Sequence, residues 1–285
     1  MDVGREEQRL EIYEKEILNQ MDYLDSNRQS WNSRVEVHMS SPFYRLDEFR
    51  NGRSSLMETE LRLLGDVSGR SILHLQCHFG QDTLSLARMG AHVTGVDLSD
   101  VAIDKARELA AELGLDASFI NCDIYSLPEQ LDKKFDIVYT SYGTIGWLPD
   151  IRRWAEVVSH FLKPGGKFVF VEFHPFVWMF DDDFTGIAYR YFNSGAIIES
   201  RTGTYADKQA PIEITDVSWN HGLGEVITAL ISGGLILKEL REYDYSHYDC
   251  FNHCVEYEKG RYRIQPMEDK IPLMYSILCQ KPDHV

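Results

Sequence analysis

Basic residues are scarce in this chain of 285 residues. Lysine and arginine number 29 against 45 aspartate and glutamate residues, so the formal net charge is −16 at pH 7. Binding to nucleic acids or to anionic membranes relies on clustered lysine and arginine. We therefore expect no nucleic-acid partner and no membrane partner, and the charge is compatible with a neutral or cationic small substrate.

Long apolar runs are also missing. The longest nearly apolar run, residues 226–237, contains polar residues and glycines and is shorter than the span of about 18 residues that a membrane helix needs. The first twenty residues are too charged for a signal peptide. Five cysteines in such a chain predict reduced thiols and a cytoplasmic protein.

Short apolar runs alternate with helical periodicity from residue 70 onward. Helices are predicted at 82–89, from Ser99 to Gly114, at 151–162 and at 222–232. Strands are predicted between them, at 71–75, 92–96, 118–121, 135–139, 167–173, 235–243 and 273–280. This alternation is typical of an α/β protein with a parallel, doubly wound sheet.

The segments around this pattern are expected to cover it. Apolar residues recur with a helical period in residues 5–30, which predicts a helix with one docked face; they are Leu10, Tyr13, Ile17, Met21 and Leu24. Residues 31–55 are predicted to be irregular and 56–64 helical. The aromatic-rich segment 173–192 predicts a small lid. We expect a helical arm at 1–64 and a main domain at 65–285, with a lid insertion at about 175–218.

Ligands of doubly wound sheets bind at the carboxyl ends of the strands. Asp97 ends the second predicted strand, where a carboxylate can accept hydrogen bonds from both hydroxyls of an adenosine ribose. The alternative is that Asp97 only stabilises the start of the helix after Ser99. In the turn 74–81, Gln76 and His78 would obstruct a pyrophosphate, which disfavours a dinucleotide. A smaller adenosine ligand with an amino-acid tail fits better.

Residues 70–174 resemble a class I S-adenosylmethionine-dependent methyltransferase. The matching segments are ILHLQCHFG, VTGVDLS, NCDIYSLP, FDIVYTSYG and FLKPGGKFVFVEF. Most of that family has an acid and spaced glycines in the first segment; here His74 stands at the acid position and Gln76 and His78 at the first two glycines. LHLQCHFGQD, WLPD, WNHGLGEVITAL and IPLMYSILCQKP resemble a narrower bacterial branch. The resemblance implies a three-layer, mostly parallel seven-stranded sheet with an antiparallel last strand.

The resemblance also implies a cofactor site. Asp97 would hold the ribose and Leu98 would pack on the adenine. Asp123 would accept from the adenine amino group, or else be a plain loop acid, while the Ile124 backbone reads the ring edge. The remaining cofactor-binding residues would be Gln76, Cys77, Phe79, Gly80, Ser141 and Tyr44. Of these, Gly80, Ser141 and Tyr44 would lie near the methionine end of the cofactor.

Several of these positions have a structural alternative. Gly80 would let the methionine tail lie against the turn. Cys77 is expected to pack rather than to act as a nucleophile. Ser141 is equally compatible with packing at the end of the sheet, and Tyr44 or Trp31 could instead anchor the core.

The acceptor side is less clear from the sequence. His174 follows the fifth predicted strand and His221 precedes a later helix, so either could take a proton from the acceptor; structural roles are the alternative. A zinc site at 247–254 is disfavoured because the histidines and cysteines there would not share one strand face. We expect no metal.

These patterns predict methyl transfer from S-adenosyl-L-methionine to a small-molecule acceptor, with S-adenosyl-L-homocysteine as product. Two alternatives stay open. One is a non-catalytic adenosyl-ligand-binding protein of the same fold, and the other is a nicotinamide-dependent oxidoreductase. The chain is expected to be a monomer or a homodimer.

Overall fold

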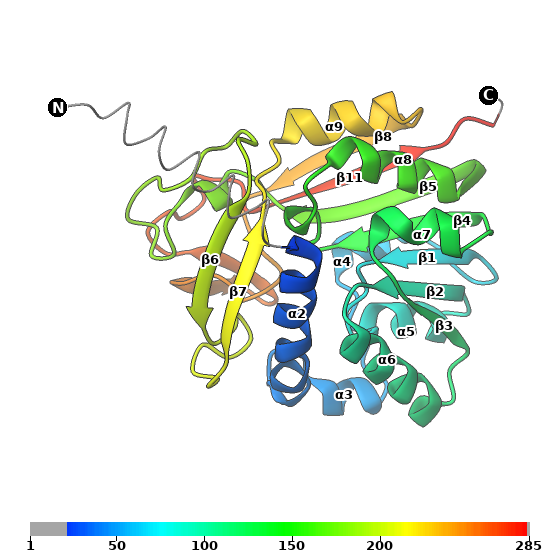
Figure 1. Ribbon diagram of the computed structural model, residues 1–285, viewed down its shortest axis with the longest axis horizontal. Coiled ribbons are helices and arrows are strands. Elements are labelled where there is room, and N and C mark those ends of the chain that lie inside the picture. Colours follow the sequence, from blue (N-terminus) through cyan, green and yellow to red (C-terminus); the bar gives the residue numbers. More distant parts are fainter. Residues whose placement is uncertain (1–21, 284–285) are drawn as a thin grey trace.

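The computed structural model describes residues 22–283 (Figure 1), so most of the predicted helix at 5–30, including Leu10, Tyr13, Ile17 and Met21, lies outside the described residues. Within the described part, helix α2 runs from Tyr23 to Ser40, followed by α3 (Leu46–Arg50) and α4 (Glu58–Leu64). The prediction that residues 31–55 are irregular is therefore wrong over 31–40 and over 46–50. No helix in this part of the chain is long and apolar enough to cross a membrane.

The continuation of α2 beyond residue 30 escaped prediction because the buried side chains of the helix are mostly polar. The Asp22 carboxylate accepts hydrogen bonds from the amides of Leu24 and Asp25 and so caps the helix. The buried side chains of the helix are Asn27, Ser30, Arg34, Val35 and His38. A helix that buries polar groups has no apolar stripe for a periodicity analysis to detect.

The central sheet confirms the predicted fold class. Its order is β3-β2-β1-β4-β5-β11-β8, and β11 is antiparallel to both of its neighbours. The strands are β1 (Ser71–Leu75), β2 (His92–Asp97), β3 (Ala117–Asn121), β4 (Phe135–Ser141), β5 (Leu162–Phe173), β8 (Ile236–Tyr243) and β11 (Met274–Gln280). The strand order reverses direction between β1 and β4, which is where ligands bind in such sheets.

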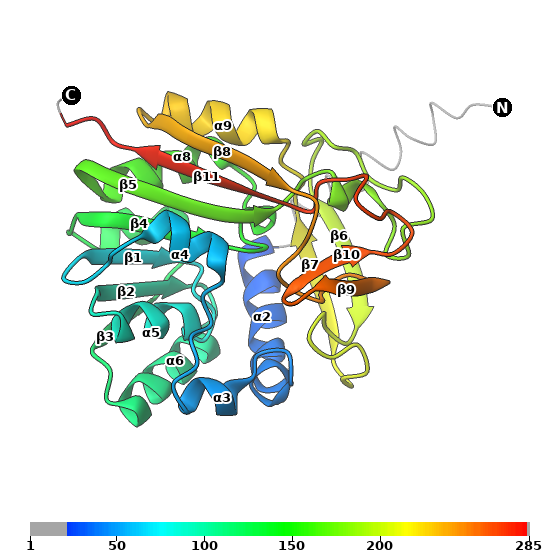
Figure 2. The ribbon, with the colours of Figure 1, turned by 180° about the vertical axis from the view of Figure 1, so that it is seen from behind.

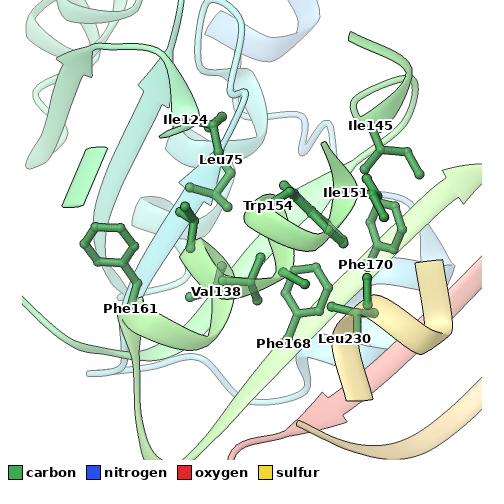
Figure 3. Close-up of a cluster of buried hydrophobic side chains, with 14 of the residues drawn as sticks. Leu75, Ile124, Val138, Ile145, Ile151, Trp154, Phe161, Phe168, Phe170 and Leu230 are labelled. Carbon is green, nitrogen blue, oxygen red and sulfur yellow. The ribbon is translucent and has the colours of Figure 1, made fainter. Parts of the chain in front are cut away.

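Helices cover both faces of the sheet (Figures 1 and 2). One face packs against α7 (Leu127–Gln130), α8 (Ile151–Phe161) and α9 (Leu223–Ser232). Its core surrounds Trp154, which is fully buried and lies against Phe168 and Phe170 of β5 (Figure 3). The other face packs against α4, α5 (Gln81–Arg88) and α6 (Asp100–Leu113).

Helix α6 illustrates how local sequence sets the ends of these elements. The Ser99 hydroxyl accepts a hydrogen bond from the Ala102 amide and begins the helix, and Gly114 ends it with a φ of 63°. Both ends are as predicted from the sequence.

Further elements lie beside the carboxyl ends of the parallel strands. An antiparallel hairpin, β6 (Ile197–Thr202) and β7 (Glu213–Ser218), falls within the predicted insertion at 175–218. A second hairpin, β9 (Cys254–Glu258) and β10 (Arg261–Ile264), follows β8 and precedes β11 along the chain. It was not predicted. In Figures 1 and 2, α2 stands between the sheet and β6–β7.

A buried ion pair joins α2 to β7. Arg34 Nη2 lies 2.6 Å from Asp216 Oδ2, and the two side chains are 5% and 3% exposed. The Ser30 hydroxyl donates to the other Asp216 oxygen at 2.6 Å. On the same helix, the Asn27 side chain donates to the Val217 carbonyl at 2.8 Å and accepts from its amide at 2.9 Å. The helix is therefore docked by polar contacts that leave few buried groups unpaired.

Asp216→Ala is expected to lower the free energy of unfolding by about 3–5 kcal/mol, because it leaves the buried Arg34 charge without a partner. Urea unfolding monitored by circular dichroism measures this. Glu108→Ala, which breaks the exposed pair with Lys105, is the control and should change stability by less than about 1 kcal/mol. Equal effects of the two variants would contradict the role of the buried pair.

Candidate functional site

The turn between β1 and α5 lies at the carboxyl edge of the sheet and has an unusual backbone. Gln76, His78 and Gly80 have φ values of 56°, 51° and 81°. A residue other than glycine loses about 1–2 kcal/mol in this left-handed region. Such conformations concentrate at functional sites. Gln76 and His78 therefore keep the backbone conformation that glycine favours, although they carry side chains.

Asp97, the last residue of β2, faces this turn. Its Oδ2 accepts a hydrogen bond from the His78 amide at 2.7 Å, and its Oδ1 accepts from the Ser99 amide at 2.9 Å. Each oxygen keeps a further lone pair, so the group can still accept two hydroxyl hydrogen bonds. Burial raises the pKa of Asp97 to about 6. The fixed carboxylate suits a ribose, and it also supports the start of α6.

The middle of the turn packs inward. Cys77 and Phe79 are 5% and 1% exposed. A Cβ at Gly95 of β2 would lie 2.8 Å from Cys77 Sγ, so this thiol fills the space that the missing side chain leaves. Burial also raises the pKa of Cys77 well above its usual range. These observations support packing for Cys77, and a direct cofactor contact by Cys77 or Phe79 stays a prediction.

Gly80 has a structural requirement that the sequence did not reveal. A Cβ at this position would lie 2.8 Å from the Phe119 ring and 3.0 Å from the Ala106 Cβ. The missing side chain therefore points at β3 and α6, and glycine is needed there for packing as well as for its φ of 81°. Contact with a methionine tail stays a prediction.

The ends of β2 and β3 meet as predicted. Asn121, which pairs with Asp97, donates from its side chain to the Leu98 carbonyl at 2.8 Å. The Asp123 carboxylate accepts from the amides of Tyr125 and Ser126 at 2.8 and 3.0 Å. This bonding caps a short 3₁₀ turn, in line with the alternative of a loop acid, and leaves lone pairs free. The Ile124 side chain is 4% exposed and belongs to the core, so only its backbone could meet a ligand.

A buried glutamate shapes the loop after β4. Glu172, which is 3% exposed, accepts hydrogen bonds from the amides of Gly143, Thr144 (2.7 Å) and Phe173 (2.7 Å). No pattern in the sequence indicates this role. The Gln76 side chain donates to the Thr144 carbonyl at 2.8 Å, which connects this loop to the turn after β1. The Gln76 Oε1 atom is buried and has no partner within residues 22–283, so an acceptor is available there for a ligand.

Ser141 ends β4 and points toward the α5 side of the sheet. Its hydroxyl accepts from the Tyr139 hydroxyl at 2.9 Å and lies 3.4 Å from the Asp82 carboxylate. This bonding supports the packing alternative, and proximity to a methionine end stays a prediction.

Aromatic residues from three segments lie over the turn. The Tyr44 ring lies 4.8 Å from the Phe79 ring and stacks on His38 at 5.1 Å between ring centres. The Trp31 ring lies 5.3 Å from both His78 and Trp147. Tyr44 therefore lies next to the turn, and its contact with the methionine end stays a prediction. Trp147 was missed because only the folded chain brings it there.

His174 and His221 both have structural partners. His174 is 5% exposed; its Nε2 lies 3.0 Å from Glu242 Oε1, and its Nδ1 accepts from the Phe176 amide at 3.1 Å. His221 is 3% exposed; its Nε2 lies 2.7 Å from the Leu148 carbonyl oxygen and its Nδ1 3.3 Å from Glu225 Oε2. These contacts support the structural alternative, and the predicted proton-accepting roles gain no support from the geometry.

The histidine- and cysteine-rich stretch at 247–254 contacts helix α4. His247 Nε2 lies 2.8 Å from the Thr59 hydroxyl. Within the described part of the chain, no three histidine, cysteine, aspartate or glutamate side chains are arranged to hold a metal ion.

A second buried carboxyl group lies near the end of β4. Glu60 of α4 is fully buried, and its Oε2 accepts a hydrogen bond from the half-buried Tyr142 at 2.9 Å. Its Oε1 has no partner among residues 22–283. Burial, together with the nearby charge of Asp82, raises the pKa of Glu60 to about 8. The Glu60 side chain is thus neutral between pH 4.5 and about pH 8, where glutamate is usually charged.

Glu60→Gln is expected to make stability less dependent on pH. Glu60 keeps its proton in the folded state up to about pH 8 but loses it near 4.5 when unfolded, so wild-type stability falls as the pH rises between these values. The advantage of the variant should grow by at most about 1.4 kcal/mol per pH unit in that window. Urea unfolding at pH 5 and pH 8 tests this, with the exposed Glu48→Gln as control. An advantage that is equal at both pH values would contradict the buried neutral state.

Comparisons with known proteins agree with this geometry. Residues 72–166 match a methyltransferase domain family. A ubiquinone biosynthesis O-methyltransferase of Alkalilimnicola ehrlichii is 32% identical over 107 residues, which cover 38% of this chain and 43% of that protein. A protein of the same name from Coxiella burnetii is 30% identical over 157 residues, which cover 55% and 64%. The matched segment thus spans less than two thirds of either relative.

Solved structures show the same architecture. An S-adenosylmethionine-dependent methyltransferase from Methanosarcina mazei has a TM-score of 0.53 at 21% identity and covers 80% of this chain and 98% of its own. A glycopeptide N-methyltransferase complexed with S-adenosylmethionine has a TM-score of 0.51 at 18% identity and covers 79% and 86%. Residues 72–166 therefore match a methyltransferase domain, and the sheet has the fold of solved S-adenosylmethionine-dependent methyltransferases.

Proposed function

We propose that this protein transfers a methyl group from S-adenosyl-L-methionine to a small-molecule acceptor and releases S-adenosyl-L-homocysteine. The observation that carries the proposal is the Asp97 carboxylate, fixed by two backbone amides and still able to accept two hydroxyl hydrogen bonds. The cofactor would supply an activated methyl group on a sulfonium. The chain's own contribution is to bind and align the two reactants and to keep water out.

The residues at the strand ends have distinct roles in this proposal. Asp97 holds the ribose and Leu98 packs on the adenine. Asp123 accepts from the adenine amino group and the Ile124 backbone meets the ring edge. The turn after β1 and its surroundings contact the methionine end, through Gln76, Cys77, Phe79, Gly80, Ser141 and Tyr44.

The acceptor is proposed to be a small molecule bound under the cover. The curated relatives are named for methylating an oxygen in ubiquinone biosynthesis. The formal charge of −16 opposes a nucleic acid as acceptor. The aromatic residues over the turn come from α2, from the segment that contains Tyr44 and from the loop after β4. These three segments would therefore shape the acceptor site.

The domain organisation follows from the same proposal. We divide the chain into an arm at 1–64 and a methyltransferase domain at 65–285 with a lid at about 175–218. The β9–β10 hairpin extends that lid. A cytoplasmic monomer or homodimer is consistent with five free cysteines and with the absence of membrane-spanning helices in the described residues.

Calorimetric titration with S-adenosylmethionine, S-adenosylhomocysteine and NAD tests the cofactor. We expect the first two to bind and NAD not to bind, because the Gln76 and His78 side chains occupy the place where a pyrophosphate would approach the backbone. No binding of either adenosyl compound would overturn the proposal. Binding without methylation of any compound in a broad acceptor panel would instead favour a non-catalytic binding protein.

Asp97→Ala is expected to weaken S-adenosylmethionine binding by about tenfold or more, which corresponds to about 1.4 kcal/mol. Asp97→Asn places an NH2 donor against one of these two backbone amides and should also weaken binding. The exposed Asp104→Ala, seven residues further on, serves as the control, and thermal melting verifies that each variant is folded. Unchanged affinity in folded Asp97→Ala would show that the ribose binds elsewhere.

A further inference from the structure

Two side-chain hydrogen bonds hold the strained residues of the turn from outside it. Gln76 donates to the Thr144 carbonyl at 2.8 Å, and His78 Nε2 lies 2.9 Å from Nδ1 of His38 on α2. Gln76 and His78 are the two residues other than glycine that have a positive φ in this turn. Each left-handed residue is therefore held by a contact that a glycine could not make.

His38 is itself held firmly. It is fully buried, and its ring lies 5.1 Å from Tyr44 in a stacked arrangement and 4.9 Å from Tyr205. Its helix is docked on β7 through the Asn27 and Arg34 contacts. The position of the His38 nitrogen is thus set by the packing of the cover and not by the turn.

The His78 backbone connects this contact to the proposed ribose site. The His78 amide points at Asp97 Oδ2 at 2.7 Å while its φ is 51°. A β-carbon makes that conformation costly, so the turn would relax toward negative φ unless another contact opposed the change. Relaxation would turn the amide away from the carboxylate.

We propose that His38 is a positioning residue for cofactor binding: its hydrogen bond to His78 holds the turn in the conformation in which the His78 amide orients Asp97. This inference rests on the proposed function, because it assigns Asp97 to the ribose of S-adenosylmethionine. It makes helix α2 part of the cofactor site. The turn after β1 would then be competent to bind only while the N-terminal cover is docked.

The charge state of the pair is consistent with this role. One ring must donate and the other accept, so at least the accepting ring has to be neutral. Burial, with Arg34 nearby, lowers the pKa of His38 to about 3. Burial and the neighbouring His38 lower the pKa of His78 well below its usual range. The hydrogen bond therefore persists at neutral pH.

A double-mutant cycle tests the proposal, with S-adenosylmethionine as the titrated ligand. His38→Ala should weaken binding by about tenfold or more. His78→Gly should bind within about threefold of wild type, because glycine adopts a positive φ without strain. His38→Ala in the His78→Gly background should then have little further effect. A merely structural role of His38 would not be rescued by a glycine on another element.

Two further variants separate positioning from general destabilisation. His38→Phe keeps an aromatic ring against Tyr44 but cannot hydrogen-bond, and should weaken binding as His38→Ala does. Leu230→Ala removes a buried apolar side chain of α9, in a core that contains no residue of α2. It should lower the melting temperature but leave the affinity within about threefold of wild type at a temperature where it is folded.

Each result decides a different claim. Unchanged affinity in folded His38→Ala or His38→Phe would overturn the positioning role, as would a double variant that binds as weakly as His38→Ala alone. Absence of binding in the wild-type protein would overturn the proposed function itself. Loss of affinity in His38→Ala, restored by His78→Gly, would establish the role.

Discussion

The hydrogen bond from the His78 amide to the Asp97 carboxylate is the contact on which the carboxyl edge of the sheet depends. It joins the turn after β1 to the end of β2, and the backbone of its donor, His78, is left-handed. Three contacts oppose relaxation of the turn. The Gln76 side chain is bonded to the loop after β4, His78 is bonded to His38 of α2, and Phe119 packs against Gly80. A conformation that glycine would adopt freely is here enforced by three separate elements.

This dependence extends the site far beyond the motif that resembles a cofactor turn. Helix α2 presents His38 only if it is docked, and its docking is polar: an arginine paired with Asp216 and an asparagine bonded to the Val217 backbone. Such contacts specify one arrangement, because each buried donor or charge has to meet its own partner. The lid hairpin therefore influences the turn through α2, although it is more than a hundred residues away along the chain.

The sequence predicts the sheet well because each strand and helix of the domain buries an apolar face. Ile72 and Leu73 point to opposite faces and meet different helices, which is what a continuous apolar run indicates. Helix α2 and the β9–β10 hairpin, which lie outside the sheet, are not predictable in this way. Helix α2 buries polar groups, and β9 is largely exposed, so neither has the pattern that predicts its structure. The contact of His38 with His78 and the burial of Glu172 depend on the folded chain and leave no local signal.

The acids at this edge have different environments, and the differences suit the proposed reaction. Asp97 is bonded to two amides, whereas Glu60 accepts a hydrogen bond from Tyr142 and is kept neutral by burial, which raises its pKa to about 8. The donor loses its positive charge as the methyl group leaves, so a carboxylate near the reacting atoms would stabilise the reactants more than the transition state. A buried carboxyl group that keeps its proton can still bond to Tyr142 without adding that unfavourable charge. The buried Glu60 of α4 thus adds no negative charge beside Tyr142, which follows β4.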